Sequence, residues 1–343
     1  MKLLSKKTNQ PKKDLYQEVT DRIIEALEKG TVPWRKPWKT DGKGKTVPFG
    51  IPANACSGHV YNGVNVLLLW LEQMEKGYAS SRWLTYRQAC QAGGNVKKGE
   101  HATMVVWYKE FLKQSKDEQG QMVFDEEGHP VLESFCVLKH HLVFNVSQCE
   151  NLPDDIAPAG VIPESFAAPD ENKVNAEAYN RIVRMIQSLG VRVSNQKIDM
   201  AFYRSCTDEI VLPKAIYFLT ESNYLSTALH EMVHATGHER RLNRIGITSQ
   251  KRSFGDEVYA FEELIAEIGS AFACAALGVT GELQHESYVD HWLNIMKADK
   301  KAIIRASKQA RLASELLFSF EQEESPEEAK SRSDEREEEA LAA

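Results

Sequence analysis

The sequence has no long run of apolar residues, and its first residues lack the apolar stretch of a secretory signal. A helix needs about 20 apolar residues to cross a bilayer, so we expect no membrane partner and no export through the Sec pathway. The six cysteines are scattered and form no C-x-x-C pair. We therefore expect reduced thiols in a cytoplasmic protein, and neither a disulfide framework nor a zinc site built on cysteine.

Length and charge predict how the chain is organised. It has 343 residues, of which 42% are hydrophobic, and this is enough for two domains with cores. The net charge of −7 is unevenly spread, because residues 1–150 hold 21 Lys and Arg against 17 Asp and Glu, whereas the remainder holds 21 against 32. A basic front half indicates a nucleic-acid partner.

Shifts in composition predict the domain boundaries. Residues 151–172 contain four prolines and few apolar anchors, which is typical of a linker between a domain over 1–150 and another over 173–320. Residues 321–343 contain ten acidic and three basic residues, so we expect a disordered acidic tail.

Apolar spacing and turn residues predict a mixed helix and strand protein of the α+β class. We expect helices over 14–29, 64–74, 81–91, 173–189, 225–238, 259–269 and, as one or two helices, 288–318. We expect strands over 101–111 and 131–145, and two or three strands across 191–212.

A short segment near the N-terminus alternates aromatic and basic residues: Trp34, Arg35, Lys36, Trp38 and Lys39. Prolines at 33 and 37 predict a loop rather than a regular element. Such a loop suits single-stranded nucleic acid, because bases stack on aromatic rings at about 1–3 kcal/mol each and cations follow the phosphates. The alternative is that both tryptophans cover the preceding helix and anchor the loop.

The string His230-Glu231-Met232-Val233-His234 is an H-E-x-x-H motif inside a predicted helix. Positions four apart on a helix lie one above the other, so both imidazoles can reach one metal ion, most naturally zinc. Glu231 lies beside them, where it can take a proton from a metal-bound water. Ordinary amphipathic helices also carry such strings, so the assignment depends on a third ligand.

A carboxylate from a later helix supplies that ligand. The third-histidine position of the metzincin pattern is Arg240, so that solution fails. The segment 259–269 resembles the glutamate helix of gluzincin metallopeptidases, in which Glu263 would be the ligand and Glu267, four residues later, would orient a ligand histidine from behind it. The alternative is a charged, solvated helix face.

The chain as a whole resembles the ArdC-type antirestriction proteins from about residue 13 to 320. In the front half the resemblance is carried by Pro33-Trp34, by Asn54, Gly58, Tyr61-Asn62-Gly63 and Asn65, by Trp83-Leu-Thr-Tyr86, by Gly93-Gly94 with Val96 and Lys98-Gly99, and by Val143-Phe-Asn-Val146. In the back half it continues through the H-E-x-x-H string with Thr236-Gly237, and through Glu262-Glu263 and Glu267. Plasmid primases of the TraC kind share the front domain.

The resemblance implies a single-stranded-DNA-binding N-terminal domain joined to a zincin-like, gluzincin-type metallopeptidase domain. It also implies carriage on a plasmid or other conjugative DNA, and protection of incoming DNA against host restriction. The DNA-binding residues we expect are Trp34, Arg35, Lys36, Trp38, Lys39, Asn65, Trp83, Tyr86, Lys97 and Lys98. In zincins an edge strand above the metal pairs with an extended substrate, and residues 210–212 are one candidate; an ordinary packing strand is the alternative.

Two functions remain open from the sequence. The first is a metallopeptidase that holds zinc, or another divalent ion such as Mn²⁺, on His230, His234 and Glu263, with Glu231 as the proton-transfer group and a host restriction protein as a possible substrate. His238, Tyr259 and His291 are candidates for stabilising the oxyanion.

The second function is protection by occupying single strands, with a latent or structural metal site, and we favour DNA binding over proteolysis as the working activity. A primase is not favoured, because the chain shows neither zinc-ribbon cysteines nor a recognisable acidic nucleotidyl-transfer motif.

Overall fold

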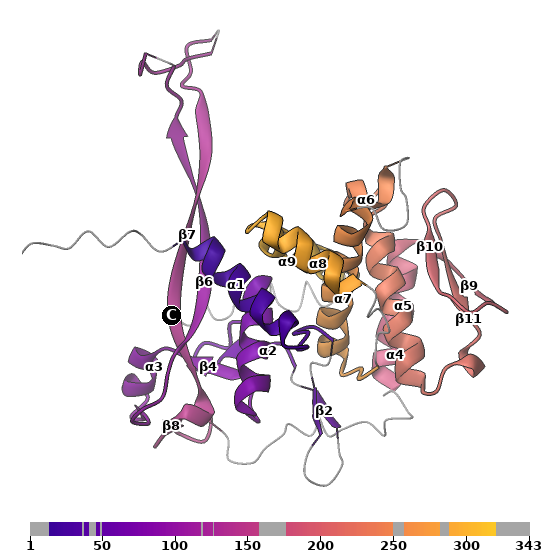
Figure 1. The fold of residues 1–343 in the computed structure, drawn as a ribbon, viewed down its shortest axis with the longest axis horizontal. Coiled ribbons are helices and arrows are strands. Elements are labelled where there is room, and N and C mark those ends of the chain that lie inside the picture. The colour runs from indigo at the N-terminus through magenta and orange to yellow at the C-terminus, as the bar shows by residue number, and fades with distance from the viewer. Residues whose placement is uncertain are drawn as a thin grey trace, which may run out of the picture.

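The computed structural model describes residues 14–35, 38–40, 46–48, 50–117, 119–125, 127–157, 176–249, 257–281 and 288–319. A front part built on a small sheet lies beside a back part built mainly on helices, and a long hairpin projects from the front part (Figure 1). The predicted mixture of helices and strands is confirmed.

The front part begins with α1 (Leu15–Glu28), which packs beside α2 (Val64–Lys76). The Asp14 carboxylate accepts hydrogen bonds from two backbone N–H groups and so caps α1. Gly77 ends α2 in the left-handed conformation that favours glycine. Both helices lie where apolar spacing predicts them.

A four-stranded sheet in the order β3-β4-β7-β6 supports α2. Its strands are β3 (Ala53–Asn54), β4 (Arg82–Leu84), β6 (Thr103–Gln114) and β7 (Leu132–Asn145). Two further short strands, β5 (Asn95–Val96) and β8 (Cys149–Glu150), pair with each other.

Two predicted elements of the front part differ from the structure. The helix expected over 81–91 is instead β4 followed by α3 (Tyr86–Gln91), because Thr85 caps a helix that begins only after it. The loop expected around Trp38 is a strand, β1 (Trp38–Thr40), paired with β2 (Thr46–Pro48). The prolines at 33 and 37 precede β1, so the backbone N–H groups of the strand stay available for pairing.

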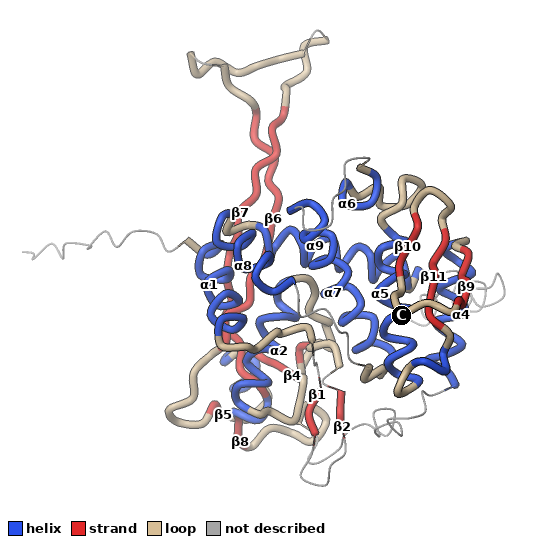
Figure 2. Tube along the Cα trace, turned by 45° about the vertical axis from the view of Figure 1, so that its right-hand side comes forward, coloured by secondary structure: helices blue, strands red, loops and turns tan. Residues whose placement is uncertain are grey.

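Strands β6 and β7 continue well beyond the sheet as a two-stranded arm (Figures 1 and 2). Their pairing runs from Thr103 opposite Val143 to Gln114 opposite Leu132. The far end of the arm exposes several large apolar side chains, namely Leu112, Met122, Phe124 and Leu132.

The back part contains α4 (Ala176–Leu189), α5 (Glu221–Thr236), α6 (Ile245–Thr248), α7 (Glu257–Leu277), α8 (Val289–Ala298) and α9 (Ala302–Leu317). Helix α7 packs against both α5 and α9. No helix within the described ranges is long and apolar enough to cross a bilayer.

Three strands lie on the far side of α5: β9 (Arg192–Gln196), β10 (Phe202–Arg204) and β11 (Glu209–Pro213). Their order is β10-β11-β9, so β11 is bonded on both sides. The idea that residues 210–212 form a free edge for a substrate is therefore wrong. A middle strand has no unpaired backbone groups to offer.

The front and back parts share one hydrophobic core. Trp34 and Trp70 from the front part are buried against Trp292 and Phe272 from the back part, with ring centroids 5.7 and 5.8 Å apart. The predicted linker falls largely on residues 158–175, which lie outside the described residues, and the domain boundaries remain a prediction.

We expect the two parts to unfold together, because removing either one would expose the aromatic contacts of the other. Scanning calorimetry of the full chain should show one main transition, and Trp70→Ala should lower the stability of the whole by about 3–5 kcal/mol. Two separate transitions, with only the first shifted by Trp70→Ala, would contradict the shared core.

Candidate metal centre

Helix α5 places the two histidines of the H-E-x-x-H string on one face. The Nε2 atoms of His230 and His234 lie 3.2 Å apart, and the rings meet edge to face with centroids 4.8 Å apart. Both side chains are buried. The helix is fixed at its start by Thr220, whose hydroxyl accepts a hydrogen bond from the Asn223 backbone.

Helix α7 brings Glu263 to the same point. Its carboxylate oxygens lie 3.4 Å from Nε2 of His230 and 3.5 Å from Nε2 of His234. Ligand atoms around a tetrahedral zinc ion, each 2.0–2.1 Å from the metal, lie about 3.3 Å from one another. Among the described residues, these three form a group whose ligand atoms all lie within 4.8 Å. Their spacing fits a divalent ion.

The approach of α7 to α5 depends on Gly269. A Cβ atom at this position would lie 2.9 Å from a methyl carbon of Val233. Any larger residue would push the helices apart and with them the three ligand atoms. Gly269 thus allows the close packing of α5 and α7.

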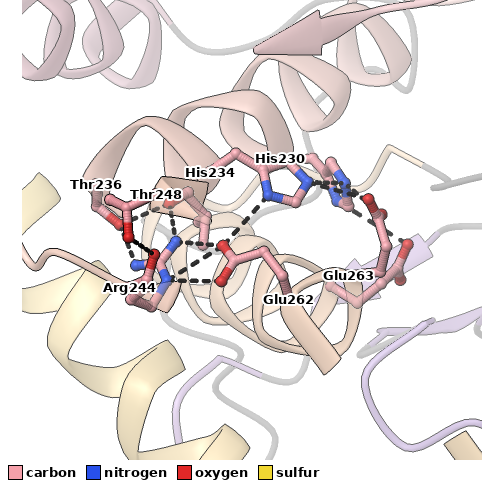
Figure 3. A network of polar contacts seen from close by, with 9 residues as sticks. His230, His234, Thr236, Arg244, Thr248, Glu262 and Glu263 are labelled. Carbon is pink, nitrogen blue, oxygen red and sulfur yellow. Dashed lines mark hydrogen bonds and ion pairs between the residues drawn. The ribbon is translucent and has the colours of Figure 1, made fainter. Parts of the chain in front are cut away.

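A second network, behind His234, was not found from the sequence (Figure 3). Nδ1 of His234 lies 3.3 Å from a carboxylate oxygen of Glu262. Arg244 donates to both oxygens of Glu262, at 2.6–3.1 Å, and also to the Thr236 hydroxyl and the Val233 carbonyl, both at 2.7 Å. Glu262 thereby fixes the His234 proton on Nδ1 and turns Nε2 toward the site.

Two glycines make room for this network. A Cβ atom at Gly237 would lie 2.9 Å from the Arg244 guanidinium carbon, and one at Gly246 would lie 2.5 Å from Cβ of Glu262. No spacing rule connects Arg244 with Glu262, since they lie on different elements. In the sequence, the only indication of this network is Glu262, a second acid next to Glu263.

Glu267 lies behind the other histidine. Its carboxylate is 3.9 Å from Nδ1 of His230, which is longer than a hydrogen bond. Burial raises the pKa of Glu267 to about 8, and the Glu263 charge adds to this, whereas Arg35 opposes it. The charge of Arg35 therefore acts on this acid, and its expected contact with DNA stays a prediction.

The histidines hold charge unequally. Burial lowers the pKa of His230. Burial also disfavours the charged form of His234, but Glu263 and Glu262 outweigh it and raise the pKa of His234 to about 10. The surrounding carboxylates therefore favour a positive charge at this point. A divalent ion would supply positive charge in place of the His234 proton.

Glu231 is the residue that we expect to transfer a proton. It follows His230 on α5, and its side chain is almost fully buried, with 5% exposed. Burial raises the pKa of Glu231 to about 7, and the Glu263 charge adds to the rise while His234 opposes it. Such a carboxyl group is poised to take and return a proton near neutral pH.

The three residues considered for stabilising the oxyanion differ in their surroundings. The ring of His238 accepts a hydrogen bond from the Arg240 backbone at 3.2 Å, and His291 is exposed on α8. The Tyr259 hydroxyl hydrogen-bonds to Glu263 itself.

Three of the residues expected to bind DNA are used by the fold. Trp34 and Trp83 are 1% and 0% exposed, so neither presents a face on which a base can stack. The Asn65 amide is hydrogen-bonded to the backbone N–H and C=O of Val106, at 2.7 and 2.8 Å. Base stacking on Trp34 and Trp83 is therefore withdrawn, because the sequence does not reveal which rings the core takes up, whereas a DNA contact of the half-buried Asn65 stays a prediction.

The remaining DNA-binding predictions are unchanged or lie outside the described residues. Tyr86 is 60% exposed, and both Lys97 and Lys98 are at the surface. The ammonium of Lys97 donates to the Ser147 carbonyl at 2.9 Å. Lys36 is outside the described residues, as are the side chains of Trp38 and Lys39, whose backbone lies in β1.

One exposed aromatic residue of the front part was not found from the sequence. Trp107 on β6 is 44% exposed, and the ammonium of Lys139, its partner across the strand pair, lies 5.9 Å from the ring centroid. The register of the strand pair, which cannot be predicted from the sequence, brings this ring and this cation together.

Comparison with known proteins identifies both parts. Residues 13–144 match the family described as the N-terminal domain of the anti-restriction factor ArdC, and residues 180–309 match the family of zincin-like metallopeptidases.

Crystal structures of the antirestriction protein ArdC from plasmid R388 resemble this chain over most of their length. The metal-free form is 36% identical, with a TM-score of 0.68 over 89% of this chain and 97% of that one. The Mn(II)-bound form is 34% identical, with a TM-score of 0.65 over 90% and 98%.

The DNA primase TraC of Escherichia coli is 35% identical over 321 residues, which is 91% of this chain but 28% of the primase. The chain thus spans little more than a quarter of that relative.

We expect Glu263 to bind the metal and Glu267 to support it from behind. Glu263→Ala should remove most bound metal, whereas Glu267→Ala should weaken binding by about 10–100-fold, as loss of an outer contact does. Metal analysis of the purified variants distinguishes the two roles. The reverse order would exchange them, and full metal content in both would leave Glu263 without a role as ligand.

Proposed function

Because this chain belongs to the family of ArdC antirestriction proteins, with a zincin-like domain, we propose that it protects incoming DNA from host restriction by binding single strands. In this proposal the back part holds a divalent ion, zinc or manganese, on His230, His234 and Glu263. The observation that carries the metal site is the 3.2–3.5 Å spacing of the three ligand atoms.

A bound divalent ion would acidify a water molecule and polarise a peptide carbonyl. The residues of this chain would do the rest. Glu231 would take the proton from the attacking water and later return it to the leaving amine. Glu262, held by Arg244, would keep His234 in its ligating tautomer.

A second function is favoured by the burial of this centre. Glu231 is 5% exposed and Glu263 is 3% exposed, so a peptide reaches them only if the surrounding chain opens. In this version the protein acts by covering single strands, and the metal site is latent. The alternative is that the site opens and cuts a host protein.

DNA binding is assigned to the exposed part of the front half. Tyr86, Trp107 and the lysines 97, 98 and 139 are the aromatic and cationic groups available for stacking and phosphate contacts. The acidic balance of the back half makes it the less suitable surface.

We expect the full chain to bind single-stranded DNA more tightly than duplex, with affinity falling as salt rises because phosphate contacts release counterions. Trp107→Ala should weaken binding by about 10-fold, from a stacking contribution of 1–3 kcal/mol. Phe124→Ala, which removes another exposed ring at the tip of the arm, is the control and should bind normally. Gel shifts without binding at low salt would refute the DNA-binding proposal.

We expect Glu231→Ala to keep metal and DNA affinity and to abolish any peptide hydrolysis, since it removes only the proton-transfer group. Glu239→Ala, which removes an exposed acid just beyond the same helix, is the control. Protection of incoming DNA in a restricting host then separates the two functions. Full protection by Glu231→Ala indicates occupancy, whereas lost protection with intact DNA binding indicates that a protein is cut.

A further inference from the structure

Two tyrosines beside Glu263 have no role in the chemistry described so far. Tyr259 lies on α7 one turn before Glu263, and its hydroxyl donates a hydrogen bond to the Glu263 carboxylate. The ring centroids of Tyr259 and Tyr288 lie 6.1 Å apart, and the two hydroxyls are hydrogen-bonded to each other. The two hydroxyls therefore form a short chain that ends on the metal ligand.

Tyr288 is itself held in place. It is 6% exposed, and its ring stacks on Trp292 with centroids 6.3 Å apart and planes 23° apart. The indole N–H of Trp292 donates to the Ala260 carbonyl at 3.0 Å. This bond fixes α8 to α7 at the residue next to Tyr259.

The last member of the series comes from the front part of the chain. Trp34 meets Trp292 edge to face, with centroids 5.7 Å apart and an interplanar angle of 62°. We call Trp34, Trp292, Tyr288 and Tyr259 the aromatic series. The charge of Arg35, the residue after Trp34, opposes the rise in the pKa of Glu267, so the front part also acts on one acid of the metal centre.

We propose that Tyr259 is a positioning residue for Glu263, and that the aromatic series supports it from the front part. The inference rests on the proposed metal site and adds residues to it. Trp34 has no contact with the ligand atoms in this account, yet metal affinity depends on it. One segment that the sequence presents as a DNA-binding loop thus serves the metal centre.

Trp70 offers a matched comparison. Like Trp34, it is a fully buried tryptophan of the front part that meets an aromatic ring of the back part edge to face, here Phe272 at 5.8 Å and 61°. Phe272 is not in the aromatic series. The Trp70 indole N–H donates to the Gly50 carbonyl, whereas that of Trp34 has no hydrogen-bond partner among the described residues. Losing Trp70 should therefore destabilise the protein at least as much as losing Trp34.

The test is titration of the metal-free full chain with Co²⁺ and Zn²⁺, with Co²⁺ followed by its visible absorption, which reports ligand geometry. Tyr259→Phe removes only the hydroxyl and should weaken binding about 10-fold or more, with an altered Co²⁺ spectrum. Trp34→Leu should change affinity and spectrum in the same direction. Trp70→Leu should lower thermal stability but leave both unchanged.

Each outcome bears on one claim. Wild-type protein that binds neither metal would overturn the proposed metal site and this inference with it. Wild-type binding together with unchanged affinity and spectrum in Tyr259→Phe would overturn the positioning role alone. Equal metal loss in Trp34→Leu and Trp70→Leu would show that Trp34 acts only through general stability, which removes the front part from the proposal.

Discussion

The close contact of α5 and α7 at Gly269 is the constraint on which the rest of this structure depends. Where a side chain would meet Val233 at 2.9 Å, the absent Cβ lets the two helices approach. The approach sets three acids of α7 against the two histidines of α5 and removes them all from water. The partners of these acids and histidines offset the free-energy cost of burying charged groups.

The three buried acids of α7 lie in three different surroundings. Glu262 is paired with Arg244, whose donors are shared with Thr236 and a backbone carbonyl. Glu263 faces both histidines and is the acid that a divalent ion would neutralise. Glu267, for which burial raises the pKa to about 8, keeps its proton at neutral pH. One helix face therefore carries a salt-bridged acid, a candidate ligand and an acid whose burial favours the neutral form, each set by its surroundings.

The shared core also changes how the two parts of the chain relate to each other. The front part supplies Trp34 and Trp70 to a core that the back part completes, so neither has a closed surface alone. The proposed surface for single strands and the metal centre rest on this one core, so they are mechanically joined.

The sequence by itself determined the local elements and the ligand pair. Apolar spacing predicts helices over 14–29, 225–238 and 259–269, where α1, α5 and the longer α7 lie. The four-residue spacing of His230 and His234 within α5 also follows from the sequence, whereas Glu263 comes from the resemblance to gluzincin metallopeptidases. These features are local, because helical geometry alone decides which residues share a face.

Only the tertiary structure decided the fate of Trp34 and Trp83, the middle position of β11 and the bond between Arg244 and Glu262. Each depends on which distant segment packs against the residue. The sequence does not show whether an aromatic ring is exposed to water or covered by another helix. Burial decides whether the ring can stack on a base or is part of the core.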